Sequence, residues 1–394
     1  MKPLNGIRVL DLSRILAGPY CSMLLSDFGA EIVKIENPMG GDDTRAYGPP
    51  FLDGESVYFL SINRGKKSLT LNLKTTESRE ILTRLIKQSD VLLENFRHDF
   101  LPGIGLDYDA VAKLNPKIVY ASVTGFGHTG PYANRPGYDL VVQGMSGIMS
   151  LTGDANGSPY KTGTSLADIT AGIYATLGIV LALYARQRTG RGQKVDVSLL
   201  DGQISLLTYQ AGIYFGTGKS PHRKGNQHPT IVPYEAFKAR DRYFNLAVGN
   251  DRLWLQFCDA IGRADLKTHP KFATNPQRVA NHDALLPILQ EVFAARDADQ
   301  WIGLFEKTGL PCGPVYSVAE TLAHPQVQAR EMVVERPHPK VGTVKMTGVP
   351  VKLSDTPGEA GDAPPLLGQH TDDVLKELGY SAEEILRFRK NKVI

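Results

Sequence analysis

The stretch "IRVLDLSRILAGPYCSMLLSDFGAEIVKIEN", residues 7–37, predicts a strand, a helix and a second strand in succession. Residues 7–13 and 31–37 are short runs rich in Ile, Leu and Val, which is typical of buried strands. Residues 19–30 between them read as a helix that ends at Gly29, a common helix terminator. Two buried strands joined by a helix favour a parallel βαβ unit.

The same alternation continues to about residue 127. Residues 67–73 alternate with the period of a strand, and residues 75–88 have the i, i+3, i+4 apolar spacing of a surface helix. Further strands are expected at 91–96 and 117–127, with a helix at 107–115 between them. The class we expect is therefore α/β, with a Rossmann-like, doubly wound parallel sheet covered by helices on both faces.

Changes in the residue pattern along the chain predict a large Rossmann-like domain and a smaller α+β domain. Residues 1–215 form the first part of the large domain, residues 225–330 the small domain, and residues 335–394 return to the large one. Stretches 126–165 and 216–233 are rich in Gly, Pro, Ser and Thr, which predicts ordered loops. One helical stretch is expected at 284–309, and the terminal "RFRKNK" is interpreted as a solvated end.

Composition excludes several functional classes. With 44 Lys and Arg against 41 Asp and Glu, the net charge of +3 does not indicate a nucleic-acid partner. The three cysteines lie far apart without a CxxC pair, and no HExxH or HxH spacing occurs, so we expect no metal and a reducing, cytoplasmic setting. The apolar run 169–185 is shorter than the roughly 20 residues of a membrane span, which favours a core helix and no membrane.

A GxGxxG match at residues 125–130, "GFGHTG", does not predict a dinucleotide site. That fingerprint needs a helix to open at its third glycine, so that the helix N-terminus can hold a pyrophosphate. Here Pro131 and Pro136 follow, and no helix can begin in time.

Asp168 is the one charged side chain in "GTSLADITAGIYATLGIVLALYA", residues 163–185. One interpretation is structural: Ser165-x-x-Asp168 is nearly a capping box, and a carboxylate suits the first turn of a helix. The other is chemical, because a carboxylate nucleophile can divide an acyl transfer into two covalent steps. The N–H groups of the same helix end could then stabilise an oxyanion. The residues alone leave both open.

Basic residues gather around successive strands. Lys74 and Arg97 each follow a strand, while Arg64, Lys66 and Lys67 precede one. Because ligand phosphates bind at the carboxyl ends of strands in a doubly wound sheet, this grouping favours a polyphosphate ligand over solvated surface charges.

Several of these motifs together resemble the class III CoA-transferases, the group containing formyl-CoA transferase and carnitine CoA-transferase. They are "VLDLSRILAGPYCSMLLSDFGAEIVKIENPMGGDDTR", "NRGKKSLTLNLK", "VLLENFR", "VTGFGHTGPYANRPGYDLVVQ" and "PPLLGQHTDDVL", in the family's order from about residue 4 to about 380. Within the family, "GPPFLDGESVYFLSINRGKKSL", "IVPYEAF" and "HPKVGTVKM" look most like the succinyl-CoA:dicarboxylate (glutarate or hydroxymethylglutarate) enzymes.

The resemblance implies that Asp168 is the nucleophile, and that CoA passes through an acyl-aspartyl anhydride and an aspartyl-CoA thioester. It implies CoA and acyl-CoA as substrates, no permanently bound cofactor, and an interlocked homodimer. The positions it assigns to CoA are Arg14, Ile15, Leu16, Ala17, Leu71, Lys74, Asn95, Phe96, Arg97, Ile104, Tyr138 and Asp139. A substrate-side loop is assigned to His228, Gly249 and Asn250, and candidates for holding a distal carboxylate are Arg14, Arg45 and His228.

Two alternatives remain on the same fold. The 2-methylacyl-CoA racemases need an acid and a base, and they place His where this chain has Tyr138. Tyrosine is a poor base at neutral pH because its reference pKa is about 10, so this position favours a transferase. A non-catalytic CoA-binding protein is the other alternative.

Overall fold

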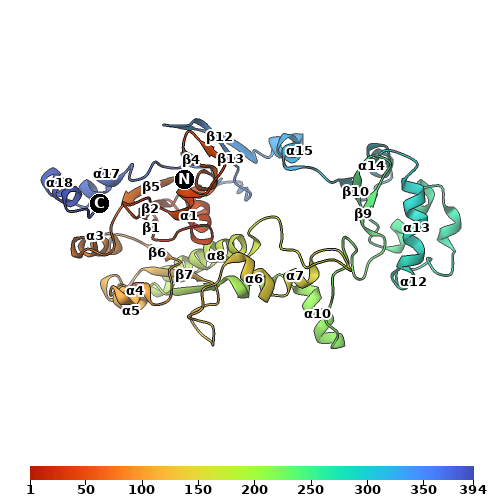
Figure 1. Cartoon of the computed structure of the whole chain (residues 1–394), viewed down its shortest axis with the longest axis horizontal. Coiled ribbons are helices and arrows are strands. Elements are labelled where there is room, and N and C mark those ends of the chain that lie inside the picture. The colour runs from red at the N-terminus through yellow and green to blue at the C-terminus, as the bar shows by residue number, and fades with distance from the viewer. The chain divides into compact units, whose positions relative to one another are not determined.

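The computed structural model describes all residues 1–394 and divides the chain into two compact units (Figure 1). The first unit comprises Met1–Ile148, Lys161–Gly212 and Pro325–Ile394; the second comprises Met149–Tyr160 and Ile213–His324. The expectation that residues 1–215 run uninterrupted through the large domain was wrong at residues 149–160. Arg223 of the second unit donates to the carbonyls of Asp154 and Gly157, which ties this stretch to residues 213–324.

The first unit is built on a six-stranded parallel sheet, which confirms the predicted α/β class. The strands are β1 (Arg8–Asp11), β2 (Glu31–Glu36), β5 (Lys66–Thr70), β6 (Val91–Glu94), β7 (Val119–Thr124) and β8 (Lys194–Ser198). Their spatial order is β5-β2-β1-β6-β7-β8, which is the Rossmann order 3-2-1-4-5-6. The order reverses between β1 and β6, so their carboxyl ends form the crevice where such folds bind ligands.

Helices cover both faces of this sheet. On one face, Leu10 and Val33 pack against α3 (Thr76–Lys87), α5 (Tyr108–Leu114), α17 (Thr371–Glu377) and α18 (Ala382–Lys390). On the other, Val9 and Ile32 pack against α1 (Ala17–Asp27) and α8 (Leu166–Thr189). Neighbouring residues of one strand thus pack into different cores, because successive side chains of a strand point to opposite faces of the sheet.

Helix α8 is 24 residues long, and by length and composition alone it could cross a membrane. The argument that the apolar run is too short for a span was therefore wrong. Packing provides a better argument for a core helix: Ala167, Ala171, Ala175 and Ile179 are fully buried in the cluster that includes strand β7.

One other prediction for the first unit was wrong, and the prediction of a solvated C-terminal end was incomplete. The expected loop 126–165 contains α6 (Asp139–Met145) and α7 (Ile148–Leu151), because an apolar segment lies between its Gly- and Pro-rich ends. The C-terminal segment is helix α18, which has a capping box and buries Ile385 and Phe388, while its charged side chains and Leu386 are largely exposed.

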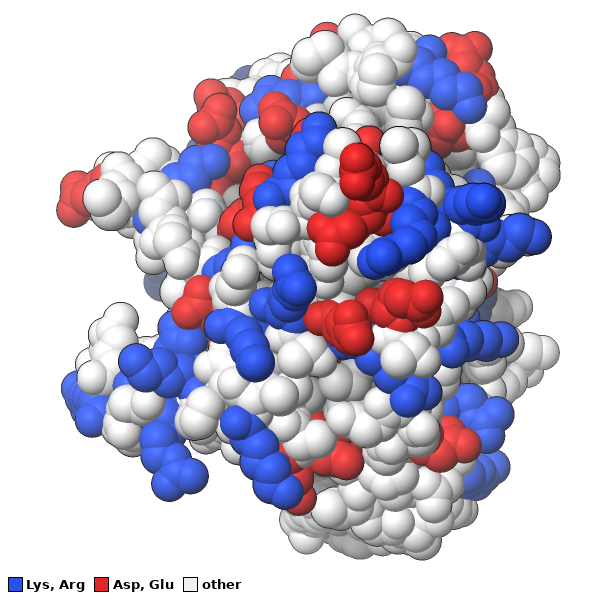
Figure 2. Space-filling model, turned by 90° about the vertical axis from the view of Figure 1, so that its left-hand side faces the viewer, with Lys and Arg blue, Asp and Glu red and all other residues white.

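The remaining elements of the first unit are short. They are β3 (Phe51–Leu52), β4 (Glu55–Ser56), α2 (Val57–Ile62), α4 (Phe100–Gly103), α9 (Leu199–Ser205), α16 (Pro325–Ala329) and the hairpin β12 (Val333–His338) with β13 (Gly342–Thr347). Helix α10 (Thr208–Thr217) continues into the second unit. Acidic and basic side chains are interspersed over much of the face shown in Figure 2.

The second unit is α+β. Its antiparallel sheet has the order β11 (Cys312–Pro314), β10 (Tyr243–Ala247), β9 (Tyr234–Lys238). Its helices are α11 (Asp251–Ala260), α12 (Asn275–Ala280), α13 (His282–Phe293), α14 (Ala298–Lys307) and α15 (Val318–Ala323). The single helical stretch expected at 284–309 is two helices, because a capping box at Asp297 begins a new one.

Candidate active site

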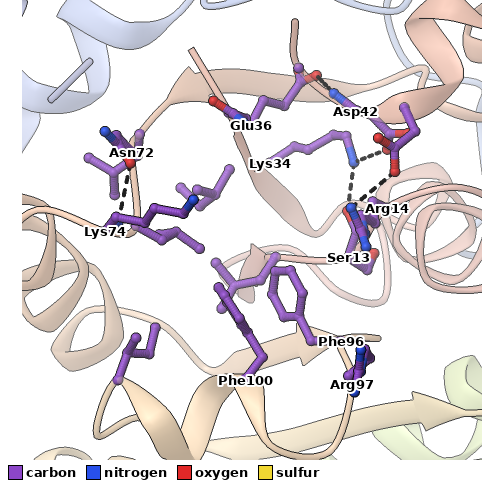
Figure 3. Close-up of a pocket in the computed structure, with 18 of the residues that line it drawn as sticks. Ser13, Arg14, Lys34, Glu36, Asp42, Asn72, Lys74, Phe96, Arg97 and Phe100 are labelled. Atoms are coloured by element: carbon purple, nitrogen blue, oxygen red, sulfur yellow. Dashed lines mark hydrogen bonds and ion pairs between the residues drawn. The ribbon is translucent and has the colours of Figure 1, made fainter. Parts of the chain in front are cut away.

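Two cavities lie at the carboxyl ends of the parallel strands. The first has a volume of about 670 Å³ and is lined by segments that follow β1, β2, β5 and β6 (Figure 3). The second, of about 460 Å³, is lined by segments that follow β1, β6 and β7 and by Asp168. They share Arg14, Phe96, Arg97 and Asp99 and therefore adjoin.

Asp168 lies in the first turn of α8 and faces the second cavity. Its carboxylate makes no hydrogen bond or ion pair with the protein, and Ser165 makes no side-chain cap. The helix start is capped instead by Asp139, whose Oδ1 accepts from the Ala167 N–H at 2.9 Å. The capping-box interpretation of Asp168 was therefore wrong, because another carboxylate has that role.

The electrostatic environment of Asp168 is unusual for a carboxylate. Burial, reinforced by the negative charge of Asp139, raises the pKa of Asp168 to about 7. Burial and then the charge of Asp168 raise the pKa of Tyr58 to about 12, so this nearby phenol stays protonated. A carboxylate without partners, lining a cavity, is available for a reaction that a structural cap could not perform.

The expected oxyanion donors of α8 are largely occupied. The N–H of Leu166 donates to the Thr164 carbonyl, that of Ala167 to Asp139, and that of Ile169 to the Ser165 carbonyl. These three N–H groups are thus already paired within the protein.

The structure brings most predicted CoA positions around the two cavities. Those lining one or both are Arg14, Ile15, Leu16, Ala17, Leu71, Lys74, Asn95, Phe96, Arg97, Ile104 and Tyr138. Asp139 lines neither, because its carboxylate is held by Ala167 and by Gln143 Nε2. His228, Gly249 and Asn250 belong to the second unit, where Asn250 caps α11, and their substrate-side role remains a prediction.

Three of the basic residues expected at phosphates have other partners. Arg64 is buried and pairs with Asp27 at 2.7 Å, and the Lys66 ammonium is buried among Pro19, Asn63 and Asp11. Lys67 pairs with Glu31. These three residues lie before or at the amino end of β5, which is the wrong edge of the sheet. Of the five basic residues grouped around the strands, only Lys74 and Arg97 line the first cavity.

Arg45, a candidate for the distal carboxylate, is also occupied. Its guanidinium makes two hydrogen bonds to Glu36, at 2.7 and 2.8 Å, and donates to the Pro365 carbonyl. It also lies 3.7 Å from the centre of the Phe59 ring. Arg14 remains open to both cavities, with its ion pair to Asp43 half exposed.

Comparison with known proteins identifies the family of this chain. A family model described as CoA-transferase family III matches residues 4–371. The chain belongs to this family. It is 44% identical to the acetyl-CoA:oxalate CoA-transferase of Acetobacter aceti, over 92% of this chain and 93% of that protein. It is 43% identical to the succinate–glutarate CoA-transferase of Agrobacterium fabrum, over 95% and 96%.

One solved structure is similar to this chain over nearly its whole length. The crystal structure of a CAIB/BAIF family protein from Brucella suis has a TM-score of 0.87 and 42% identity, covering 96% of this chain and 99% of that one. The chain is therefore a CoA-transferase, and CoA thioesters are its substrates.

Sequence reasoning missed several residues of the transferase site. Lys34 and Asp42 line the first cavity as a fully buried ion pair, and Arg135 lines the second. The apolar residues of strand β2 predicted a buried strand, but they gave no sign that Lys34 within it is buried as well. The doublet of Asp42 and Asp43 was a usable signal, since it lies in the loop that follows the carboxyl end of β2.

Proposed function

We propose that this transferase moves CoA reversibly from a dicarboxylyl-CoA, such as succinyl-CoA, to a dicarboxylate acceptor through intermediates on Asp168. The observation that supports it is the Asp168 carboxylate, which faces the second cavity without a hydrogen-bonding partner. The name of the Agrobacterium fabrum relative supports dicarboxylates as both donor acid and acceptor, and that of the Acetobacter aceti relative supports a dicarboxylate on one side of the exchange.

The chemistry needs a carboxylate and no separate base. An Asp168 oxygen attacks the thioester carbonyl, the C–S bond breaks, and CoA leaves as a thiolate with Asp168 as a mixed anhydride. The thiolate then attacks the Asp168 carbonyl carbon, releasing the donor acid as a carboxylate and leaving an aspartyl-CoA thioester. The acceptor carboxylate repeats both steps in reverse. No proton is gained or lost, which suits a site whose nucleophile has no paired acid or base.

Trapping the intermediates tests this proposal. Protein incubated with succinyl-CoA and then hydroxylamine is expected to carry a hydroxamate on Asp168, measured by mass spectrometry of its peptides. A matched sample without succinyl-CoA should carry none. Deuterium exchange into a 2-methylacyl-CoA without CoA transfer would instead show a racemase, and the absence of both reactions would show a binding protein. Glutaryl-, oxalyl- and acetyl-CoA, each offered with a panel of acids, define the acyl pair.

We further propose that the CoA phosphates bind at Lys74 and Arg97 in the first cavity. Lys74→Ala is expected to raise the Kd for CoA about tenfold, as the loss of one charge-assisted contact should, and more at low salt, where screening is weakest. Isothermal titration with CoA measures the effect. Lys87→Ala is the matched control, because Lys87 is also exposed but lies in the last turn of α3, outside both cavities. Equal affinities of both variants would contradict the site.

The oligomeric state we propose is a homodimer, interlocked as the family resemblance implies. It is supported by an exposed apolar stripe on α8, at helical spacing: Ile173 (48% exposed), Leu177 (51%), Leu181 (58%) and Tyr184 (54%). A contiguous apolar stripe of this kind marks an interaction surface. Light scattering of the purified protein measures its mass directly.

A further inference from the structure

The loop of residues 13–17 follows β1 and has a conformation that its sequence disfavours. Ile15 has φ = 69°, in the left-handed region that β-branched residues rarely adopt. Such a conformation persists only where the surroundings impose it, and it is frequent at active sites. Ile15, Leu16 and Ala17 line the second cavity together with Asp168, so this loop and the first turn of α8 border the same cavity.

A buried ion pair from the next strand holds the beginning of this loop. The Lys34 ammonium donates to the Ser13 carbonyl at 2.8 Å and pairs with Asp42 Oδ2 at 2.8 Å (Figure 3). The other oxygen of Asp42 accepts from the Ile15 N–H at 3.2 Å. Burial alone would raise the pKa of Asp42, but the Lys34 charge holds it at about 2, so the pair is ionised at any working pH.

Asn95, at the end of β6, holds the middle of the loop. Its Oδ1 accepts from the Arg14 N–H at 2.9 Å, and its Nδ2 donates to the Arg14 carbonyl at 2.7 Å. This carboxamide therefore bridges the ends of β1 and β6, at the point where the strand order reverses. Both bonds go to the protein backbone, which argues against the prediction that Asn95 contacts CoA.

We propose that Lys34, Asp42 and Asn95, here called the backbone clamp, are positioning residues that present the acyl-CoA thioester to Asp168. They fix four backbone groups of residues 13–15 and so impose the strained conformation of Ile15. The proposal rests on the proposed role of Asp168. Its physical basis is that the Asp168 oxygen and the thioester carbonyl carbon must lie nearly in contact for the attack to occur. A displacement of the loop by about 1 Å would move the thioester out of that position.

Asn95→Ala tests the clamp with little risk to folding, because this side chain is only partly buried. We expect kcat for CoA transfer from succinyl-CoA to glutarate to fall roughly 10- to 100-fold, as misplacement by about 1 Å does. The Kd for CoA should stay within about twofold of the wild-type value, a margin well below one lost hydrogen bond. Asn115→Ala is the matched control, since Asn115 is also partly buried and also bonds only to backbone groups, those of Ile86, Ser89 and Lys117, outside both cavities. It should leave kcat far less affected.

Rescue separates the clamp from ordinary structural damage. In the Asn95→Ala background, Ile15→Gly should recover part of kcat, because glycine adopts positive φ without a steric penalty. In the Lys34→Met background, Asn95→Ala should lower kcat by less than it does alone, because both residues hold one loop. No recovery by Ile15→Gly, or full additivity of Lys34→Met and Asn95→Ala, would overturn the clamp.

The outcomes also separate the clamp from the function on which it rests. No hydroxamate on Asp168 in the wild-type protein would refute the proposed nucleophile. A normal wild-type hydroxamate, formed at the same rate in Asn95→Ala, would refute the clamp alone. A raised Kd for CoA with unchanged kcat would also refute the clamp, and would return Asn95 to direct CoA binding.

Discussion

Asp168→Asn is expected to abolish CoA transfer, with kcat lowered by at least roughly 1,000-fold, as loss of a covalent nucleophile does in other enzymes. The amide has nearly the same shape as the carboxylate but cannot form the anhydride or be regenerated from it. The measurement is the conversion of succinyl-CoA and glutarate to glutaryl-CoA. Affinity for CoA should change little, because the first cavity does not include Asp168. Retention of more than a few per cent of activity would contradict its role.

The pH dependence of the wild-type protein reports on the same carboxyl. Because the pKa of Asp168 is about 7, kcat/KM should rise with pH up to about 7 and then level off, following the ionised form. Since the pKa in the folded state lies above its ordinary value of 3.8, ionising Asp168 costs stability as pH rises from about 4 towards 7. Asp168→Asn should therefore melt at a higher temperature than the wild type at pH 8, which also shows that the variant is folded.

The fold could be predicted from the sequence wherever the apolar pattern of a segment matches the burial of its residues. Strands β1, β2, β6 and β7 are short, mainly apolar runs between helices, which is typical of a parallel sheet covered on both faces. Helix α18 could not be recognised by its apolar content, because only Ile385 and Phe388 of its charged sequence are buried. Its capping box, Ser381 with Glu384, was a usable signal.

The site could be predicted in part. Asp168 was conspicuous because it is one carboxylate before a long apolar run, but its local sequence left a helix cap and a nucleophile both open, and only the family resemblance favoured the nucleophile. Whether a basic residue lines a cavity depends on which end of the strand it occupies. Lys74 follows β5 and lines a cavity, while Arg64 and Lys66 lie at the other end of β5 and are buried. Lys34 could not be found, because a lysine within a strand reads as exposed until its partner Asp42 is known to fold over it.

Gly172 controls how closely the nucleophile's helix approaches the loop of residues 13–17. It lies one turn after Asp168 on α8, and a Cβ atom there would lie 2.7 Å from the Ala17 carbonyl oxygen and 3.1 Å from the Tyr20 ring. The first contact is with backbone, which cannot rotate away as a side chain can. An alanine at this position must therefore displace α8 from the beginning of α1, although alanine itself favours a helix by about 1 kcal/mol relative to glycine.

Gly172→Ala is expected to lower kcat roughly 100-fold, because separating Asp168 from the thioester-lining loop by about 1 Å removes the near-contact geometry. Gly178→Ala is the matched control: it lies on the same helix, gains the same helix propensity, and its Cβ would meet only a methyl group of Val195, at 2.6 Å. That methyl group can move, so this variant should retain most of the activity. Steady-state transfer from succinyl-CoA to glutarate, with circular dichroism to confirm folding, compares the two. Equal activities would show that the spacing of α8 and α1 does not limit the reaction, and hence that Asp168 does not attack a thioester held against this loop.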